Sequence, residues 1–300
     1  MSPFRHIRLF TAIKTPYLEN GKFDLKCFDD LVIKQIEGGT QGLIIGGTTG
    51  EGHLMSWDEH IMLIAHCVNR FSDKLRIIGN TGSNNTKEAL KATEQGFNVG
   101  MHGSLQVNPY YGKTSNDGLM AHFEKVLDLG PAIIYNVPSR TNQDIPVAVI
   151  EELAKNKNLV GIKECAGNDR IGFYEKKGIA CWSGNDDQAH DARHQFNAHG
   201  VISVTSNVFP KTMRHLMDKP DPVLNQSLQP FIQWLFCEPN PIGINTLLAM
   251  MGRVRPVFRL PYVPLRKNRQ LEVKEILQNL KLDEIIGEIK IMEEKEFSII

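Results

Sequence analysis

The sequence has few cysteines, and their spacing does not pair them. The five cysteines are far apart along the chain and include no CxxC pair. A disulfide framework is built from an even set of cysteines, and a zinc ribbon or finger needs closely spaced thiolates, so neither is expected. We therefore expect free thiols in a reducing compartment.

Long apolar runs and an excess of one charge are also missing. No run reaches the ~18 residues of a membrane-spanning helix, and the N-terminal segment lacks the apolar core of a signal peptide. Lys and Arg number 34 and Asp and Glu number 34, so the formal net charge is zero. This balance argues against general affinity for nucleic acid or for an anionic membrane, and we expect neither as a partner.

The chain instead contains eight short apolar runs of β-forming residues, separated by helical patterns. The runs lie at residues 11–15, 41–47, 75–81, 103–108, 132–137, 159–164, 179–184 and 200–207. Most lack period-two alternation, which is typical of parallel strands covered on both faces. Signals for the start of a helix fall between the runs, at Asp24, Ser56 with Glu59, Asn85, Ser115 or Asn116, and Pro146.

Eight strand–helix units in succession predict an α/β fold of the TIM type, a (β/α)8 barrel. We expect the barrel to occupy residues 1–222, because Pro220 and Pro222 mark a boundary there. Residues 223–300 are mostly helical in pattern, at 224–236, 241–251 and 271–280. They predict a helical C-terminal domain packed on the barrel.

Active sites of such barrels lie at the C-terminal ends of the strands, and Lys163 is the unusual residue there. It follows four apolar or small residues in a strand that should be buried. Burial disfavours the charged form and lowers the pKa of a lysine, which provides the neutral amine that Schiff-base enzymes need. The alternative is a structural lysine paired with an adjacent acid such as Glu164. From these residues alone both explanations stay open.

Other strand ends carry groups suited to a small anionic substrate. The glycine-rich turn GGTTGE at 46–51 can present backbone N–H groups to an anion, but it has neither the ending of a P-loop nor a GxGxxG motif. Tyr110, Tyr111 and Tyr135 could move protons or could pack at the mouth of the barrel. Arg140 could bind a carboxylate or extend into solvent.

Two further patterns are weaker. His190 and His194 lie four residues apart, but no third ligand is evident and HExxH is absent, so we expect no metal site. Asp186 and Asp187 are expected to cap the helix that follows them.

Several segments together resemble the dihydrodipicolinate synthase family, in particular its plant-type branch. The matching motifs run in order along the chain: GGTTGE at 46–51, NPYYGKTS at 108–115, IIYNVPSRT at 133–141, GIKEC at 161–165, WSGNDD at 182–187, GVISVTSN at 200–207 and RPVFRLPYVPL at 255–265. One departure is Asn142, where the family usually has glycine. Asparagine tolerates a positive φ better than most residues, so the loop that carries Arg140 should be kept.

The resemblance implies an activity and the residues that perform it. The activity is the condensation of pyruvate with L-aspartate-4-semialdehyde to 4-hydroxy-tetrahydrodipicolinate, the first committed step of lysine biosynthesis by the diaminopimelate route. The implied residues are Lys163, Tyr135, Thr49, Tyr111 and Arg140 for catalysis, and Thr48, Thr49, Arg140, Gly184 and Ile202 for substrate binding.

In the implied mechanism Lys163 would form an imine with pyruvate. Tyr135, Thr49 and Tyr111 would relay protons, with Tyr111 supplied by a neighbouring subunit, and Arg140 would bind the carboxylate of the semialdehyde. Because the imine nitrogen acts as the electron sink, no cofactor and no metal are expected.

The resemblance also implies regulation, assembly and location. L-Lysine would inhibit at a subunit interface, although the same residues could merely pack that interface. The chain would form a homotetramer, a dimer of dimers, in the chloroplast stroma as a mature form if it comes from a plant, and in the cytoplasm otherwise. The positions that match the lysine site are His53, Trp57, His60, Asn84, Glu88 and Tyr110.

Two other functions stay open from the sequence. Another pyruvate-dependent aldolase, such as an N-acetylneuraminate lyase or a 2-keto-3-deoxy sugar acid aldolase, would share Lys163 and Tyr135. Arg140 and the tyrosine pair at 110–111 favour a short, charged aldehyde over a sugar. A catalytically silent barrel that senses lysine would not need the full catalytic set.

Overall fold

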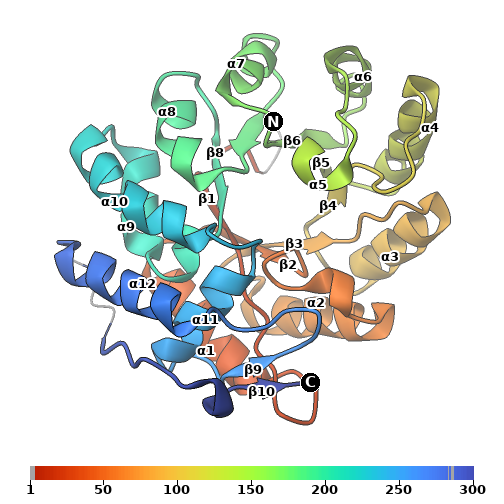
Figure 1. Cartoon of the computed structure of the whole chain (residues 1–300). Coiled ribbons are helices and arrows are strands. Elements are labelled where there is room, and N and C mark those ends of the chain that lie inside the picture. The colour runs from red at the N-terminus through yellow and green to blue at the C-terminus, as the bar shows by residue number, and fades with distance from the viewer. Residues whose placement is uncertain (1–3, 283, 285–286) are drawn as a thin grey trace.

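Eight parallel strands close into a barrel at the centre of the molecule (Figure 1). The computed structural model describes residues 4–282, 284 and 287–300. Each strand pairs with the next along the chain and the last pairs with the first, which confirms the predicted TIM barrel. The strands are β1 (Leu9–Ala12), β2 (Gly42–Ile45), β3 (Arg76–Asn80), β4 (Gly103–Val107), β5 (Ala132–Asn136), β6 (Leu159–Glu164), β7 (Cys181–Ser183) and β8 (Gly200–Ser203).

Helices connect the strands and form an outer layer around them (Figure 1). They bury the outward side chains of the strands, while the inward side chains fill the barrel, and this double burial explains the missing period-two alternation. The helices are α1 (Leu25–Glu37), α2 (Trp57–Phe71), α3 (Thr86–Asn98), α4 (Asn116–Leu127), α5 (Pro138–Thr141), α6 (Val147–Leu153), α7 (Asn168–Lys176), α8 (Ala189–His194) and α9 (Pro210–Asp218).

Four of the helix starts that the sequence predicts are confirmed by cap hydrogen bonds. The side chains of Asp24, Asn85 and Ser115 each accept a hydrogen bond from a backbone N–H in the first turn of α1, α3 and α4. Ser56 and Glu59 form the predicted capping box at the start of α2. These side chains replace the missing backbone partners of the first turn.

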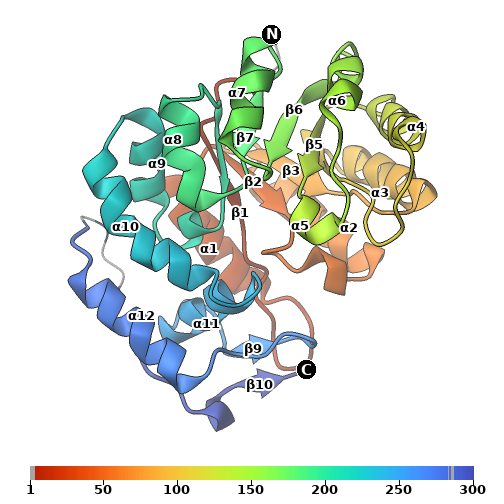
Figure 2. The same ribbon diagram turned by 45° about the horizontal axis from the view of Figure 1, so that its top comes forward.

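The region after β5 differs from the prediction in two respects. A short helix, α5, follows β5 directly at the carboxyl end of the barrel, as Figure 2 shows, and no pattern in the sequence predicted it. Pro146 precedes α6 as its N-cap residue, whereas we expected it at the first helical position. The proline does fix the chain at the start of the helix, one residue earlier than expected.

The predicted capping by the acidic pair is wrong. Gln188 precedes α8, and no side chain caps that helix. Asp186 is instead buried and accepts hydrogen bonds from the backbone N–H of Val204 (2.9 Å) and from Thr205 N–H (2.7 Å) and hydroxyl (2.8 Å). These bonds turn the chain out of the sheet, so β8 ends at Ser203 and 205–207 forms a 3-10 turn in place of the predicted strand end.

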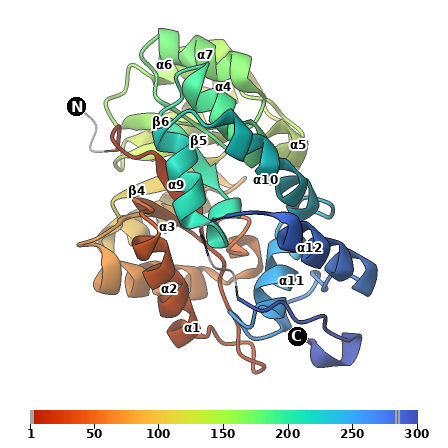
Figure 3. The same ribbon diagram turned by 90° about the vertical axis from the view of Figure 1, so that its left-hand side faces the viewer.

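Three helices follow the barrel and lie together on one side of it (Figures 2 and 3). They are α10 (Pro222–Leu235), α11 (Ile242–Met250) and α12 (Lys267–Asn279), close to the predicted ranges. A short parallel sheet of β9 (Val257–Phe258) and β10 (Ser298–Ile299) was not predicted. One hydrophobic cluster contains residues of both parts, among them Leu9, Phe231 and Leu247, so this extension completes the core on its side. Among the described residues, no helix has both the length and the apolar character that a bilayer crossing requires.

A buried ion pair connects the extension to the barrel. Lys14, just after β1, pairs with Glu51, and their side chains are 2% and 0% exposed. Asn245 on α11 donates a hydrogen bond to the same carboxylate (2.6 Å). Burial lowers the pKa of Lys14, and the Glu51 carboxylate opposes this shift. Glu51 itself has φ 61°, a conformation that is uncommon for a residue other than glycine, and its side-chain partners hold it there.

Removing one partner of this pair should cost more stability than removing both. In Lys14→Met or Glu51→Gln the remaining group is left buried without its partner, and we expect the free energy of unfolding to fall by about 3–5 kcal/mol. The double variant should lose less than either single variant. Urea unfolding at one fixed protein concentration measures all three, and additive losses would contradict an ion pair at this position.

Candidate active site

The carboxyl ends of the strands surround a cavity of about 690 Å³. This size is in the range of small-molecule sites. Most of the residues that the sequence predicted for the site line this cavity, namely Thr48, Thr49, Tyr135, Arg140, Lys163 and Gly184, together with His53, Trp57, His60 and Tyr110.

Lys163 points into the cavity from β6 and is 8% exposed. Its ammonium nitrogen lies 4.2 Å from the ring centre of Tyr135, which is its neighbour in register on β5. Within the described residues Lys163 has no ion-pair partner, because the adjacent Glu164 points to the other side of the strand, toward Arg170. The alternative of a lysine paired with Glu164 is therefore rejected. Burial lowers the pKa of Lys163, which favours the neutral amine.

Tyr135 keeps its proton at neutral pH. It is buried, and burial raises its pKa well above the ordinary value of a tyrosine. A group that is protonated and hydrogen-bonded can donate a proton to a developing anion and take it back. Gly184 leaves room for the side chains of Lys163 and Cys165. A Cβ at this position would come within 2.3 Å of Cys165 Sγ and 3.0 Å of Lys163 Cε.

The turn after β2 brings two threonines to the cavity floor. Gly46 has φ 65°, and a Cβ on it would lie 1.8 Å from a ring nitrogen of His60, so this position requires glycine. Thr49 is buried and its hydroxyl oxygen accepts a hydrogen bond from Asn240 Nδ2 (3.0 Å). Thr48 is half-buried, and no hydrogen bond joins either threonine to Tyr135 among the described residues.

Arg140 lies on the short helix α5 and is exposed at the mouth of the cavity. The helix ends at Thr141, and the capping residue that follows, Asn142, has φ 55°. The expectation that asparagine replaces glycine there in a left-handed conformation is confirmed.

Two residues of the predicted site do not line the cavity. Tyr111 is 93% exposed and has φ 71°, so its ring points away from the centre of its own chain. Ile202 is 1% exposed and packs inside the barrel near Tyr135.

The six positions predicted for lysine binding are divided between the cavity and its surroundings. Trp57 and His60 stack with ring centres 5.5 Å apart on α2, and burial lowers the pKa of His60 to about 4, so its ring is neutral near pH 7. Asn84 lies outside the lining and donates a hydrogen bond to the backbone oxygen of Tyr110 (3.2 Å). Glu88 is in the first turn of α3, also outside the lining.

Several residues that line the cavity were not predicted from the sequence. Asn240, Phe236 and Tyr262 come from the C-terminal extension, and the Tyr262 hydroxyl lies 2.8 Å from His53 Nε2. Cys165 is two residues from Lys163 and also lines the cavity. Phe236 ends a predicted helix, whereas Asn240 and Tyr262 stand in Pro-containing segments with no periodic pattern, and nothing in the local sequence connects these residues to the cavity.

The histidine pair of α8 is engaged by the backbone. His190 Nε2 accepts a hydrogen bond from Asp221 N–H (3.0 Å), and His194 Nε2 lies 2.8 Å from the carbonyl oxygen of Leu216. In the part of the chain that the structure describes, no group of three or more His, Cys, Asp or Glu residues is arranged to hold a metal ion. All five cysteines are free thiols.

Comparison with known proteins tests the family resemblance that the sequence motifs indicate. The chain matches the model of the Dihydrodipicolinate synthetase family over residues 5–280. A chloroplastic 4-hydroxy-tetrahydrodipicolinate synthase of Nicotiana tabacum is 58% identical over 297 residues, which cover 98% of this chain and 83% of that protein. The chloride-inhibited dihydrodipicolinate synthase of Acinetobacter baumannii, complexed with pyruvate, is 33% identical with a TM-score of 0.86, covering 91% of this chain and 98% of that one.

A second solved structure is the lysine-bound enzyme of Cyanidioschyzon merolae. It is 27% identical with a TM-score of 0.85, and the match covers 91% of this chain and 98% of that one. Since the family model spans most of the sequence and the barrel agrees with these structures, the chain belongs to the dihydrodipicolinate synthetase family.

Proposed function

We propose that this chain condenses pyruvate with L-aspartate-4-semialdehyde to give 4-hydroxy-tetrahydrodipicolinate, in the biosynthesis of lysine. The observation that carries the proposal is the buried Lys163, which contacts the ring of Tyr135 on the adjacent strand and has a lowered pKa. The tobacco relative bears the name of this activity, and the Acinetobacter enzyme was solved with pyruvate.

The reaction begins with the neutral amine of Lys163. It attacks the ketone carbon of pyruvate, water leaves, and an imine forms. The imine nitrogen accepts electrons, so the methyl group of pyruvate loses a proton and becomes an enamine carbon. This carbon attacks the aldehyde carbon of the semialdehyde. The substrate amine then attacks the imine carbon, the ring closes, and Lys163 is released as the free amine.

Two anionic groups need binding sites during this sequence. We assign the pyruvate carboxylate to Thr48 and Thr49, whose turn presents backbone N–H groups, and the semialdehyde carboxylate to Arg140. Gly184 and Ile202 contribute their backbones. The protein amine is itself the electron sink, so the proposal includes no cofactor and no metal.

Protons are relayed by Tyr135, Thr49 and Tyr111. Because Thr49 accepts a hydrogen bond from Asn240, its own O–H is free to donate toward a neighbour. Tyr111 points out of its own chain, as it would if it completed the site of a neighbouring subunit. The relay therefore requires at least a dimer.

Reductive trapping tests the central step. Incubation with pyruvate and borohydride should place a reduced adduct on Lys163, detected by peptide mass spectrometry, and Lys163→Ala should show none. A trapped adduct followed by turnover of aspartate-4-semialdehyde, and not of N-acetylneuraminate or a 2-keto-3-deoxy sugar acid, supports the proposal. An untrapped, folded protein would contradict it and favour the silent lysine sensor.

The two threonines can be separated by matched variants. Thr49→Val removes the proposed relay hydroxyl at nearly constant volume, and we expect kcat to fall by about 10²-fold or more. Thr48→Val keeps the relay and should mainly raise KM for pyruvate. Steady-state kinetics of both variants measure kcat and KM for pyruvate. A larger loss of kcat in Thr48→Val than in Thr49→Val would contradict the assignment of the relay to Thr49 and favour Thr48 instead.

We also propose that L-lysine inhibits the enzyme at the six positions His53, Trp57, His60, Asn84, Glu88 and Tyr110. The lysine-bound structure of the Cyanidioschyzon enzyme supports this proposal. The carboxylate of Glu88 suits the ammonium group of the ligand, and Tyr110 adjoins Tyr111, which links the effector to the relay.

Trp57→Ala tests the regulatory proposal. Removal of the stacked ring should raise the concentration of L-lysine for half-inhibition by about tenfold or more, with little change in kcat without lysine. Initial rates over a lysine series measure this effect. Activity of the wild-type protein that stays constant at saturating lysine would refute the proposal.

Assembly, location and domain limits complete the proposal. We propose a homotetramer made of two dimers, located in the plastid, since the tobacco relative is chloroplastic. We propose residues 1–222 as the catalytic barrel and residues 223–300 as the helical C-terminal domain. Residues of the second part line the cavity of the first, so both parts are needed for activity.

A further inference from the structure

The position of Arg140 is set by the backbone that carries it. The Arg140 side chain is exposed and has no hydrogen bond or ion pair within the described part of the chain. The helix α5 has only 4 residues, and a single helical turn is not stable without tertiary support. The loop at 137–145 must therefore be held by contacts with the elements around it.

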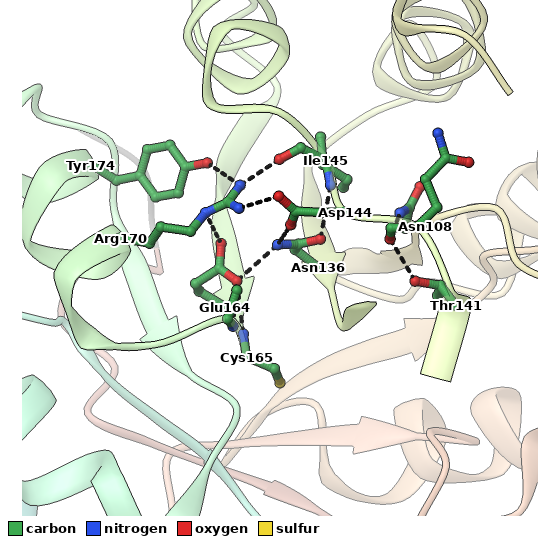
Figure 4. Close-up of polar contacts among 11 residues, drawn as sticks. Asn108, Asn136, Thr141, Asp144, Ile145, Glu164, Cys165, Arg170 and Tyr174 are labelled. Atoms are coloured by element: carbon green, nitrogen blue, oxygen red, sulfur yellow. Dashed lines mark hydrogen bonds and ion pairs between the residues drawn. The ribbon is translucent and has the colours of Figure 1, made fainter. Parts of the chain in front are cut away.

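The first anchor is the side chain of Asn136, at the end of β5. Its Nδ2 donates hydrogen bonds to Asp144 Oδ1 (2.8 Å) and Glu164 Oε1 (2.9 Å), and its Oδ1 accepts one from the N–H of Ile145 (3.1 Å). One buried amide thus joins the end of the loop that carries Arg140 to the residue next to Lys163 (Figure 4).

The second anchor is Arg170, which reaches the same place from α7. Its Nη1 donates to Asp144 Oδ2 (2.5 Å), and its Nη2 donates to the carbonyl oxygen of Ile145 and to the hydroxyl of Tyr174 (3.0 Å). Its Nε lies 3.3 Å from Glu164 Oε2, an ion-pair contact without hydrogen-bond geometry. The planar guanidinium contacts all of these groups at once, which a lysine could not do (Figure 4).

Glu164 connects this network to the catalytic strand. Its carboxylate accepts hydrogen bonds from the backbone N–H of Cys165 (2.9 Å) and Ala166 (2.8 Å), so it also fixes the segment that follows Lys163. Its side chain is 0% exposed, and Arg170 supplies the nearest positive charge. Arg170 therefore compensates a buried charge and holds both loops together.

Asn108, which follows β4, holds the 137–145 loop on the side away from α7. Asn108 Nδ2 donates to the carbonyl oxygen of Gln143 (2.6 Å), and the same oxygen accepts a hydrogen bond from Thr141 (2.8 Å) (Figure 4). With contacts from β4 on one side and from α7 on the other, the loop has little freedom to shift along the mouth of the cavity.

We propose that Arg170 and Asp144 are positioning residues for the second substrate, because their contacts fix Arg140 relative to Lys163. The inference depends on the proposed function, in which Arg140 binds the carboxylate of the semialdehyde. Arg170 and Asp144 themselves do not line the cavity and do not touch the reacting atoms.

The prediction concerns the two substrates separately. Asp144→Asn removes the charge that Arg170 holds in the loop but leaves the buried pair of Arg170 and Glu164 intact. Arg170→Lys keeps a positive charge but loses the planar guanidinium that contacts Asp144, Ile145 and Tyr174 at the same time. Both variants should raise KM for aspartate-4-semialdehyde by about tenfold and change KM for pyruvate and the yield of trapped adduct by less than twofold. Lys177→Met is the matched control, since Lys177 lies at the end of α7 and makes an exposed ion pair with Glu151 (3.3 Å).

Double variants distinguish positioning from general stability. If Arg170 and Asp144 act through Arg140, then Asp144→Asn should have no further effect on KM for the semialdehyde in an Arg140→Ala background. A further rise in that background, or an equal rise in KM for both substrates, would overturn the inference. A wild-type protein that traps pyruvate but does not use the semialdehyde would refute the proposed function, and the inference with it.

Discussion

The chemistry of this chain depends on keeping one amine away from water. The closed barrel buries the Lys163 side chain, and this burial lowers the pKa of the amine, which favours the neutral form that the proposed reaction needs. The neighbouring positions are shaped by this requirement. The ring of Tyr135 lies beside the amine on the adjacent strand, and a Cβ on Gly184 would come within 2.3 Å of Cys165 Sγ and 3.0 Å of Lys163 Cε. The lowered pKa of Lys163 is therefore a consequence of burial within the whole barrel and not of the local sequence.

The alternation of a β-strand lets one segment do two tasks. Successive side chains point to opposite faces, so Lys163 enters the cavity while Glu164 faces α7. We assign the first residue to the substrate, and the second anchors the outer network of Arg170 and Asn136. The residue assigned to catalysis and the residue that anchors the network are therefore adjacent in the sequence. A shift of β6 by one residue would exchange the two side chains and destroy both arrangements.

The sequence predicted the features that depend on local pattern. The barrel and the family were predicted from strand runs, from helix caps such as Ser56 with Glu59, and from the family motifs. Each of these signals lies within a short continuous segment of the chain. Predictions from the sequence were wrong or missing where a side chain has a partner that is far away along the chain. Asp186 resembles a helix cap, yet its partners are the backbone and hydroxyl groups after β8. Asn240 and Tyr262 reach the cavity from a segment without periodicity, and no spacing rule connects them to the barrel. The assigned roles of the site residues stay predictions.

The extension after the barrel has a consequence for how such proteins can vary. Asn240 contacts Thr49, and Asn245 contacts the Glu51 carboxylate, so two amides from outside the barrel hold the middle and the end of the turn that we assign to pyruvate. A chimaera that took its C-terminal helices from another protein would keep these contacts only if the donor also carried the two amides. We therefore expect a recombinant joined at the boundary between the barrel and its C-terminal helices to lose support for this turn unless both asparagines are retained.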